Sequence, residues 1–287
     1  MKKILILLVI SIMLSVVTAY GSGIQMSSPD KINTEKDPWI GQYCMSIFTK
    51  TRTSKTVGKD HVSVALKVQH FDWTQVRGSE GGYHGRTSGQ QKQRLATTLC
   101  TKYGWAENHH IAVGVPFWFN DFDIPGKTND SEGLGNVFVF EKWNCIKETN
   151  NFPAVAVDFW YYFPTGEADR KLGTDNGAYK ITTEISKAWE DFSLHFNPGY
   201  TWSENNDAEV GEINGALLLT SYPNFWPAVE YNYFQKESSG HRNDIIPGFI
   251  WKFAKGWSFK AGATINIDST FTDRDRVGVV LKLFRRW

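Results

Sequence analysis

The chain has 287 residues and a formal net charge of +1, because 31 lysines and arginines balance 30 aspartates and glutamates. This balance excludes the basic surface that a nucleic-acid-binding protein needs. Hydrophobic residues make up only 41% of the chain, yet aromatic residues reach 15% and include 12 tryptophans. Membrane β-barrels have this composition, since polar residues line their interior and aromatic residues gather at the two membrane interfaces.

The first residues have the pattern of a secretory signal peptide. Met1–Lys3 give a basic start, an apolar run follows over 4–17, and small residues end it. This pattern predicts a signal peptide over 1–19 with cleavage after Ala19. After residue 20 no stretch of about 18 apolar residues occurs, so we expect no transmembrane helix.

Residues 20–58 differ in kind from the rest of the chain, because they are polar and rich in turn-forming residues. We expect them to form a periplasmic lead segment, for which two interpretations stay open: a plug that folds into a barrel mouth, or a flexible tail. The chain has three cysteines, Cys44, Cys100 and Cys145, so at most one intramolecular disulfide can form. Their spacing matches no metal site, and no motif indicates a cofactor.

From residue 59 onward the chain alternates short apolar-patterned segments with polar turns. The predicted strands are about 61–76, 92–105, 111–120, 134–147, 155–163, 179–189, 192–202, 210–221, 225–235, 245–253, 257–268 and 276–287. Long polar loops follow the odd-numbered strands and short turns follow the even-numbered ones. An all-β, antiparallel, up-and-down transmembrane β-barrel of about 12 strands over 59–287 explains this sorting, with short periplasmic turns and longer extracellular loops.

The last predicted strand carries the clearest membrane signal. Val277, Val279, Leu281 and Leu283 fall on one face and continue to the aromatic Trp287. A barrel needs such a strand, because its last strand must pair with its first to remove every free edge in lipid. We therefore predict that the barrel-assembly machinery recognises this strand.

The strand near 134–147 is the least regular of the set. Whichever alternation is chosen, Glu141 or Lys142 faces lipid. A β-bulge or a local break in the pattern is the expected explanation.

Several short stretches resemble one known family. They are Val62–Leu66 with Phe71 and Asp72, Tyr103–Trp105 before Val113–Phe117, Gly133–Asn136, Phe163–Gly166 and Pro198–Thr201. In order and spacing they are similar to the meta-pathway phenol-degradation family of transporter-like outer-membrane barrels. Asn136 replaces the family's usual acid, and Arg285 stands where an outward aromatic residue is usual. The resemblance implies the barrel fold, a Gram-negative outer membrane and a link to aromatic-compound catabolism.

Twelve strands about 4.8 Å apart and tilted by about 40° close into a cylinder roughly 24 Å across, which suits only small solutes. The inward-facing candidates for solute passage combine charges of both signs with bulky rings: Lys67, Arg94, Lys102, Asp158, Trp160, Tyr162, Lys180, Glu184, His195, Glu212, Trp226, Glu230, Lys260, Asp268 and Lys282. They fit a passive porin-like transporter for small, aromatic or hydrophobic compounds. They fit equally a closed structural or surface-binding barrel in which opposite charges pair and the rings fill the lumen.

An enzyme is the third interpretation, and the sequence disfavours it. His61 and Ser63 have the spacing of a base and nucleophile on one strand face, but no suitably placed residue follows to orient the histidine. His195 is interpreted as a hydrogen-bonded lumen residue, and His109 with His110 as solvated residues of a turn. The expected partners are therefore outer-membrane lipid, small-molecule solutes and the assembly machinery, with no nucleic acid.

Overall fold

The computed structural model describes residues 50–77, 83–85, 91–124, 127–128, 130–205, 209–236, 240–270 and 273–287. The predicted signal peptide and residues 20–49 of the predicted lead segment lie outside these ranges. Within them, no helix is long and apolar enough to cross a membrane.

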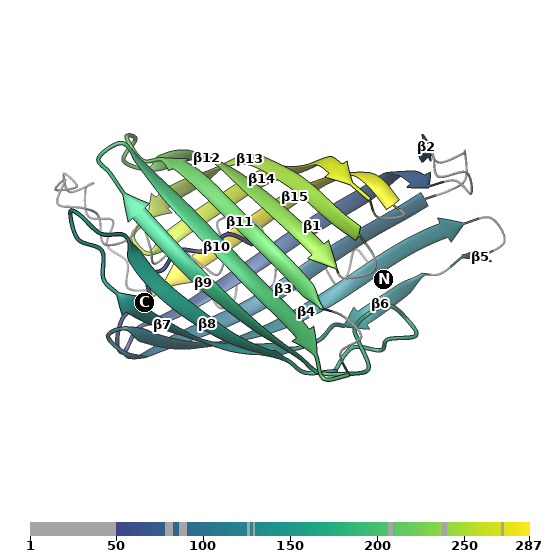
Figure 1. Ribbon diagram of the computed structural model, residues 1–287, viewed down its shortest axis with the longest axis horizontal. Helices are drawn as coiled ribbons and strands as arrows, with labels where there is room; N and C mark the ends of the chain where they lie inside the picture. Colours follow the sequence, from purple (N-terminus) through teal and green to yellow (C-terminus); the bar gives the residue numbers. More distant parts are fainter. Residues whose placement is uncertain are drawn as a thin grey trace. The chain divides into compact units, whose positions relative to one another are not determined.

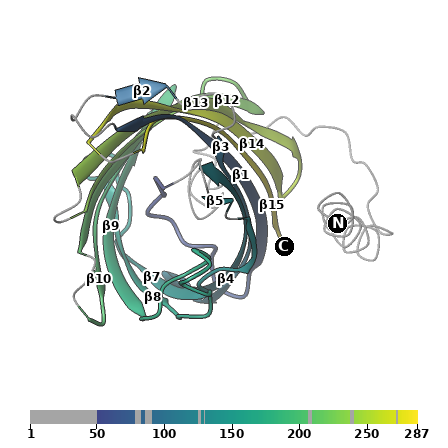
Figure 2. The same ribbon diagram turned by 90° about the vertical axis from the view of Figure 1, so that its right-hand side faces the viewer.

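The described residues form twelve long antiparallel strands that close into a barrel (Figures 1 and 2). In chain order they are β1 (Val62–Arg77), β3 (Gln91–Ala106), β4 (His109–Ile124), β7 (Phe138–Ile146), β8 (Ala154–Tyr162), β9 (Ala178–Ala188), β10 (Phe192–Ser203), β11 (Val210–Leu219), β12 (Phe225–Lys236), β13 (Gly240–Ala254), β14 (Trp257–Ser269) and β15 (Asp273–Arg286). Three short strands extend the sheet at its rim: β2 (Tyr83–Gly85) beside β1, and β5 (Lys127–Thr128) and β6 (Ser131–Leu134) beside β4. The predicted twelve-stranded all-β barrel is confirmed.

The barrel closes between its first and last strands. The β1–β15 register runs from Ser63 opposite Arg286 to Val76 opposite Asp273. The backbone N–H of Trp287 continues this pairing by donating to the carbonyl of Val62 at 3.0 Å. Every long strand therefore has two neighbours, which lipid requires because it cannot hydrogen-bond a free strand edge.

Side chains alternate between an apolar outside and a mixed interior, as the period-two pattern predicts. On β15, Val277 is 52% exposed and Val279 is 48% exposed, whereas Val280 and Phe284 are 1% exposed. A soluble protein would bury its valines and leucines, so an exposed apolar face around the whole ring indicates contact with lipid.

Aromatic rings gather outside at both ends of the barrel. We call the end with turns 107–108, 147–153, 189–191, 220–224 and 255–256 the short-turn end, and the other the long-loop end. At the long-loop end Tyr179 lies 4.9 Å from Tyr161 and 5.9 Å from Trp202, between ring centroids. At the short-turn end His109 lies between Trp105 and Trp143. Such girdles mark the two membrane interfaces.

The irregular fourth strand contains the predicted bulge. The β7–β8 register shifts between Asn144 and Ile146. Lys142 points inward and is 1% exposed, while the Glu141 side chain lies outside, 46% exposed, beside His109. Glu141 therefore lies on the outer face, near a membrane interface, and Lys142 lies in the interior.

Two connections at the long-loop end are shorter than predicted. The last two hairpins there have connections of only three residues, 237–239 and 270–272. Antiparallel pairing continues from Lys236 directly to Gly240, whose φ of +116° permits the sharp reversal. The polar residues that indicated long loops are therefore the outer ends of longer strands.

Gly104 is required by a close backbone approach at the short-turn end. A Cβ at this position would lie 1.7 Å from the carbonyl oxygen of Gly58, where the chain passes from the lumen into β1. A Cβ at Gly211, by contrast, would meet nothing within 4 Å.

We expect Gly104→Ala to lower the free energy of unfolding by about 1–3 kcal/mol, because the backbone at Gly58 must shift. Urea titration of the refolded barrel measures this difference, with Gly211→Ala as the matched control. Equal stability of the two variants would contradict the close approach.

Candidate functional site in the barrel interior

Residues 50–57, here called the lumenal segment, lie inside the barrel. Figure 2 shows this part of the chain within the ring of strands. Thr51 and Ser54 are 0% exposed and Val57 is 1% exposed, although the segment belongs to no strand. Its contacts run from His110 near the short-turn end to Glu212 and Phe234 nearer the long-loop end. These contacts place residues 50–57 in the barrel interior.

Arg52 is the central anchor of the lumenal segment. Its guanidinium pairs with Asp158 of β8, and its Nε lies 3.5 Å from Oε1 of Glu184 on β9. Its backbone N–H donates to the side-chain oxygen of Asn197 on β10. Burial alone would lower the pKa of Arg52, but these carboxylates raise it above its ordinary value. The arginine therefore stays charged and ties three strands to the segment.

Lys142 of β7, the strand next to β8, contacts the same two carboxylates as Arg52. Its ammonium donates to the carbonyl of Thr53 at 2.7 Å, pairs with Glu184, and lies 3.8 Å from Asp158. Two cations thus face two carboxylates in a buried cluster. Buried charges are tolerated only when they are paired in this manner.

A second charged group holds the other end of the lumenal segment. The Lys50 ammonium lies 2.7 Å from Glu212 on β11, and Lys180 of β9 pairs with the same carboxylate. The backbone N–H of Lys50 donates to Glu230 on β12 at 2.8 Å. The two groups together fasten the segment to consecutive strands from β7 to β12.

Neutral hydrogen bonds fix the segment at the short-turn end. The Asn144 amide donates to the carbonyl of Ser54 at 2.8 Å, and the Ser54 N–H donates to Ser186 Oγ at 3.0 Å. Ser186 Oγ also lies 2.8 Å from Nδ1 of His195, whose Nε2 lies 3.2 Å from Ser193 Oγ. His195 is therefore the hydrogen-bonded lumen residue that the sequence indicated.

The prediction that His110 is solvated was wrong. His110 is 0% exposed, its Nδ1 accepts from the N–H of Val57 at 3.3 Å, and its ring meets Phe140 edge-on. Strand alternation turns it inward, and the lumenal segment covers it. Its neighbour His109 points outward and pairs with Glu141 at 3.1 Å.

Aromatic rings line the wall beside the Arg52 cluster. Trp160 stacks on Phe140 with centroids 3.9 Å apart and lies 6.0 Å from Tyr162. The Arg52 guanidinium lies 4.4 Å from the Trp160 ring centroid, a cation–π contact. The stacked rings and the Arg52 guanidinium therefore stabilise each other's positions through this contact.

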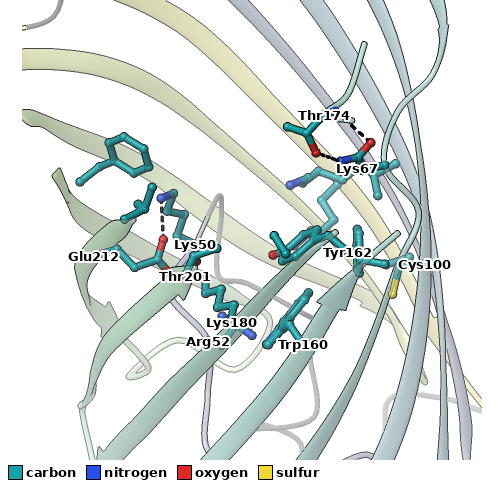
Figure 3. A pocket seen from close by; sticks show the side chains of 18 residues that line it. Lys50, Arg52, Lys67, Cys100, Trp160, Tyr162, Thr174, Lys180, Thr201 and Glu212 are labelled. Atoms are coloured by element: carbon teal, nitrogen blue, oxygen red, sulfur yellow. Dashed lines mark hydrogen bonds and ion pairs between the residues drawn. The ribbon is translucent and has the colours of Figure 1, made fainter. Parts of the chain in front are cut away.

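A cavity of about 420 Å³ remains beside the lumenal segment (Figure 3). Lys50 and Arg52 of the segment form part of its lining. From the barrel wall, Lys180 and Glu212 lie on the side of Lys50, and Lys67 lies on the other, with Tyr162 between them. The interior is thus partly filled by the chain and partly hollow.

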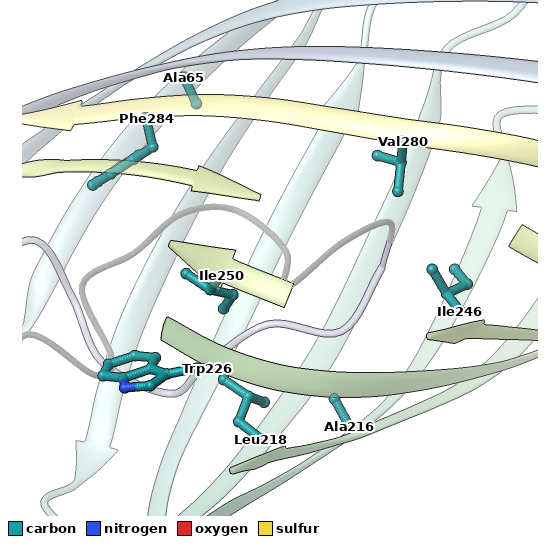
Figure 4. Packing of buried hydrophobic residues seen from close by; sticks show 8 residues of the cluster. All are labelled: Ala65, Ala216, Leu218, Trp226, Ile246, Ile250, Val280 and Phe284. Carbon is teal, nitrogen blue, oxygen red and sulfur yellow. The ribbon is translucent and has the colours of Figure 1, made fainter. Parts of the chain in front are cut away.

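The remaining residues that were predicted to face the interior lie in different parts of the barrel. Lys102, Lys260 and Lys282 are buried on inward faces, and Arg94 lies farther toward the long-loop end, over Trp118 and bonded to Asn120. Trp226 belongs instead to an apolar cluster on the other wall (Figure 4). Its members are Ala65, Ala216, Leu218, Trp226, Ile246, Ile250, Val280 and Phe284.

Asp268 does not join the buried charge network, so its prediction as an inward residue was wrong. The β13–β14 register shifts between Asn243 and Asp244, which breaks the alternation of β14 after Asn266. Asp268 then pairs with His241 at 2.9 Å and its side chain is 50% exposed. A bulge of this kind cannot be read from the alternating pattern alone.

Sequence reasoning missed three residues of the network: Lys50, Arg52 and Lys142. Lys142 could have been found by placing Trp143 outward in the interfacial girdle, which turns Lys142 inward. Lys50 and Arg52 precede the first strand, so no alternation assigns them a side.

His61 immediately precedes β1, and Ser63 belongs to this strand. His61 Nδ1 lies 2.6 Å from the carbonyl oxygen of Trp287. Ser63 Oγ is buried and has no hydrogen-bond partner among the described residues. No hydrogen bond therefore joins the two side chains among the described residues, as a base and its nucleophile would require.

Two known structures of outer-membrane channels share this architecture. An outer membrane channel from Pseudomonas putida F1 matches with a TM-score of 0.67 at 10% identity, over 82% of this chain and 98% of that one. The NanC porin matches with a TM-score of 0.51 at 9% identity, over 77% of this chain and 98% of the porin. The fold is therefore that of an outer-membrane channel barrel.

A family model described as "Putative MetA-pathway of phenol degradation" matches residues 49–276. The chain belongs to this family, as the resemblance of its short motifs indicated. No curated protein matches the chain by sequence. The matched range begins just before the lumenal segment and includes the whole charge network.

We expect Lys142→Met to lower the free energy of unfolding by about 3–5 kcal/mol, because it leaves Asp158 and Glu184 with one cation fewer in a buried site. Urea titration monitored by circular dichroism measures the change. Glu141→Gln, one residue away on the outer face, should change stability by less than about 1 kcal/mol. A small effect of Lys142→Met would contradict the anchoring role.

Proposed function

We propose that this protein is a passive channel of the bacterial outer membrane for small aromatic or hydrophobic solutes. The observation that carries the proposal is the cavity beside the lumenal segment, because a barrel built only as a scaffold needs no cavity lined by charges and rings. Family membership and the channel-type fold support it. Among the described residues, ion pairs, cation–π contacts and hydrogen bonds hold the lumenal segment, and these can open without breaking a covalent bond.

A closed barrel with a structural or surface-binding role is the competing proposal. It is favoured by the buried pairing of Arg52 and Lys142 with Asp158 and Glu184, which holds the lumenal segment across the interior. The two proposals differ in whether a solute can pass the segment. Neither requires an enzymatic residue.

The proposed location rests on the exposed apolar outer face and its aromatic girdles. Residues 1–19 are proposed to direct export, after which β15, ending near Trp287, is recognised by the barrel-assembly machinery. The short turns then face the periplasm and the long loops face the exterior.

We expect the refolded full-length protein to show small, fluctuating single-channel currents in a planar bilayer. Deleting residues 50–57 should give larger and steadier currents, because the deletion removes the part of the chain that occupies the lumen. Arg52→Ala should give an intermediate behaviour, since the segment loses its central anchor.

Arg170→Ala is the matched control, because Arg170 pairs with Glu167 in an exposed loop. It should conduct like the unmodified protein. Silence of the full-length and deletion proteins, with folding confirmed by heat-dependent migration on a gel, would favour the closed barrel.

The orientation is tested by cysteine labelling in intact cells, in a Cys145→Ser background because Cys145 is exposed. Asp169→Cys and Asn205→Cys should react with a membrane-impermeant maleimide, since both lie in connections at the long-loop end. Glu107→Cys, in a turn at the opposite end, should react only after cell lysis. The reverse pattern would invert the proposed topology.

A further inference from the structure

Arg285 is an outward-facing cation near the short-turn end of β15. It lies directly opposite Trp257 of β14 and Val64 of β1, whereas its neighbour Phe284 points inward and is 1% exposed. Strands β14, β15 and β1 lie side by side in the barrel wall (Figure 1). Arg285 is therefore on the lipid-facing side of the wall, where interfacial aromatic residues gather.

Two indole rings hold the Arg285 guanidinium. Its central carbon lies 4.4 Å from the ring centroid of Trp287 and 4.8 Å from that of Trp257. Phe253 packs against Trp257 in turn, with ring centroids 6.0 Å apart. These cation–π contacts position the guanidinium before a ligand arrives, which lowers the entropy cost of binding.

The guanidinium has five N–H donors, and the described residues offer them no oxygen acceptor. Within the described ranges, the interactions of the Arg285 side chain are its two ring contacts. The carbonyl oxygen of Trp287 lies instead 2.6 Å from Nδ1 of His61. A charged group at the edge of the hydrocarbon region is costly without a partner, so an acceptor from outside the described chain is favoured.

Lys187 shows how the barrel satisfies an outward cation from its own chain. It is the outward cation of β9 at the same end of the barrel. Its ammonium donates to the carbonyls of Thr149 and Asn150 at 2.6 and 2.9 Å, and Glu148 lies 3.9 Å away. Arg285 has no equivalent set of oxygens among the described residues, so the two outward cations differ in what they leave for a ligand.

We infer that Arg285 and Lys255 form a site for the phosphate of an anionic phospholipid of the phosphatidylglycerol class. A guanidinium binds phosphate oxygens through two parallel hydrogen bonds. Lys255 is exposed in the two-residue turn before Trp257, beside the end of β15, and adds a second positive charge. The indole rings would pack against the glycerol region of the lipid. The inference needs only the lipid contact of the outer face and is independent of conduction.

The chemistry separates this lipid from related ligands. Phosphatidylcholine has the same phosphodiester, but its ammonium group would lie close to Lys255 and be repelled. Inorganic phosphate satisfies the guanidinium but has no apolar part to pack against Trp257 and Trp287. Phosphatidylglycerol suits the cations and the rings together.

Binding is measured by native mass spectrometry of the refolded full-length protein in a maltoside detergent, which contains no phosphate. We expect one phosphatidylglycerol to bind with a dissociation constant about tenfold below that of phosphatidylcholine with the same acyl chains. Inorganic phosphate at the same concentration should displace none of it. Equal affinity for the two lipids, or displacement by phosphate, would overturn the inferred ligand.

Arg285→Gln should raise the dissociation constant for phosphatidylglycerol by about tenfold, because it removes the charge-assisted hydrogen bonds. Arg285→Lys should have an intermediate effect, since it keeps the charge but loses the planar fork. Lys255→Gln should reduce the preference for phosphatidylglycerol over phosphatidylcholine by about fivefold. Heat-dependent migration on a gel checks that each variant is folded.

Lys187→Gln is the matched control, because Lys187 is an outward cation at the same end whose donors are already engaged. It should leave phosphatidylglycerol binding unchanged. Equal weakening by Arg285→Gln and Lys187→Gln would mean a general attraction of anionic lipid and overturn the site. Unchanged binding by folded Arg285→Gln would overturn it as well.

Discussion

The pairing of β1 with β15 is the constraint on which the rest of the structure depends. In a bilayer no water is available to hydrogen-bond a strand edge, so twelve strands are stable there only as a closed ring. Closure assigns each residue of a strand to the lipid or to the lumen. The charged side chains of β7–β12 are thereby confined to the interior, where each must find a partner of opposite sign or a hydrogen bond.

The lumenal segment meets part of that requirement. Asp158 and Glu184 lie on neighbouring strands with Lys142 close to both, and Arg52 adds the second cation to the two carboxylates. The cost of leaving buried charges unpaired therefore favours the inserted segment. Noncovalent anchors of this kind stabilise the filled state of the interior.

The interior of the barrel is chemically asymmetric. The wall from β7 to β12 carries most of the ion pairs and hydrogen bonds of the segment. Parts of β11–β13, β15 and β1 carry the apolar cluster of Figure 4 instead. The cavity lies where cations from both walls approach stacked rings.

The sequence by itself determined the barrel, because the period of two is a local property: neighbouring residues of a strand point to opposite sides whatever the strand pairs with. Alternation within each strand was therefore enough to assign Asp158, Glu184, His195 and Glu212 to the interior. The tertiary structure alone decided the shift that exposes Asp268, and it alone brought Arg52 to Asp158, 106 residues away in the chain. Register and the insertion of a remote segment depend on partners across space, and no alternation within one strand encodes them.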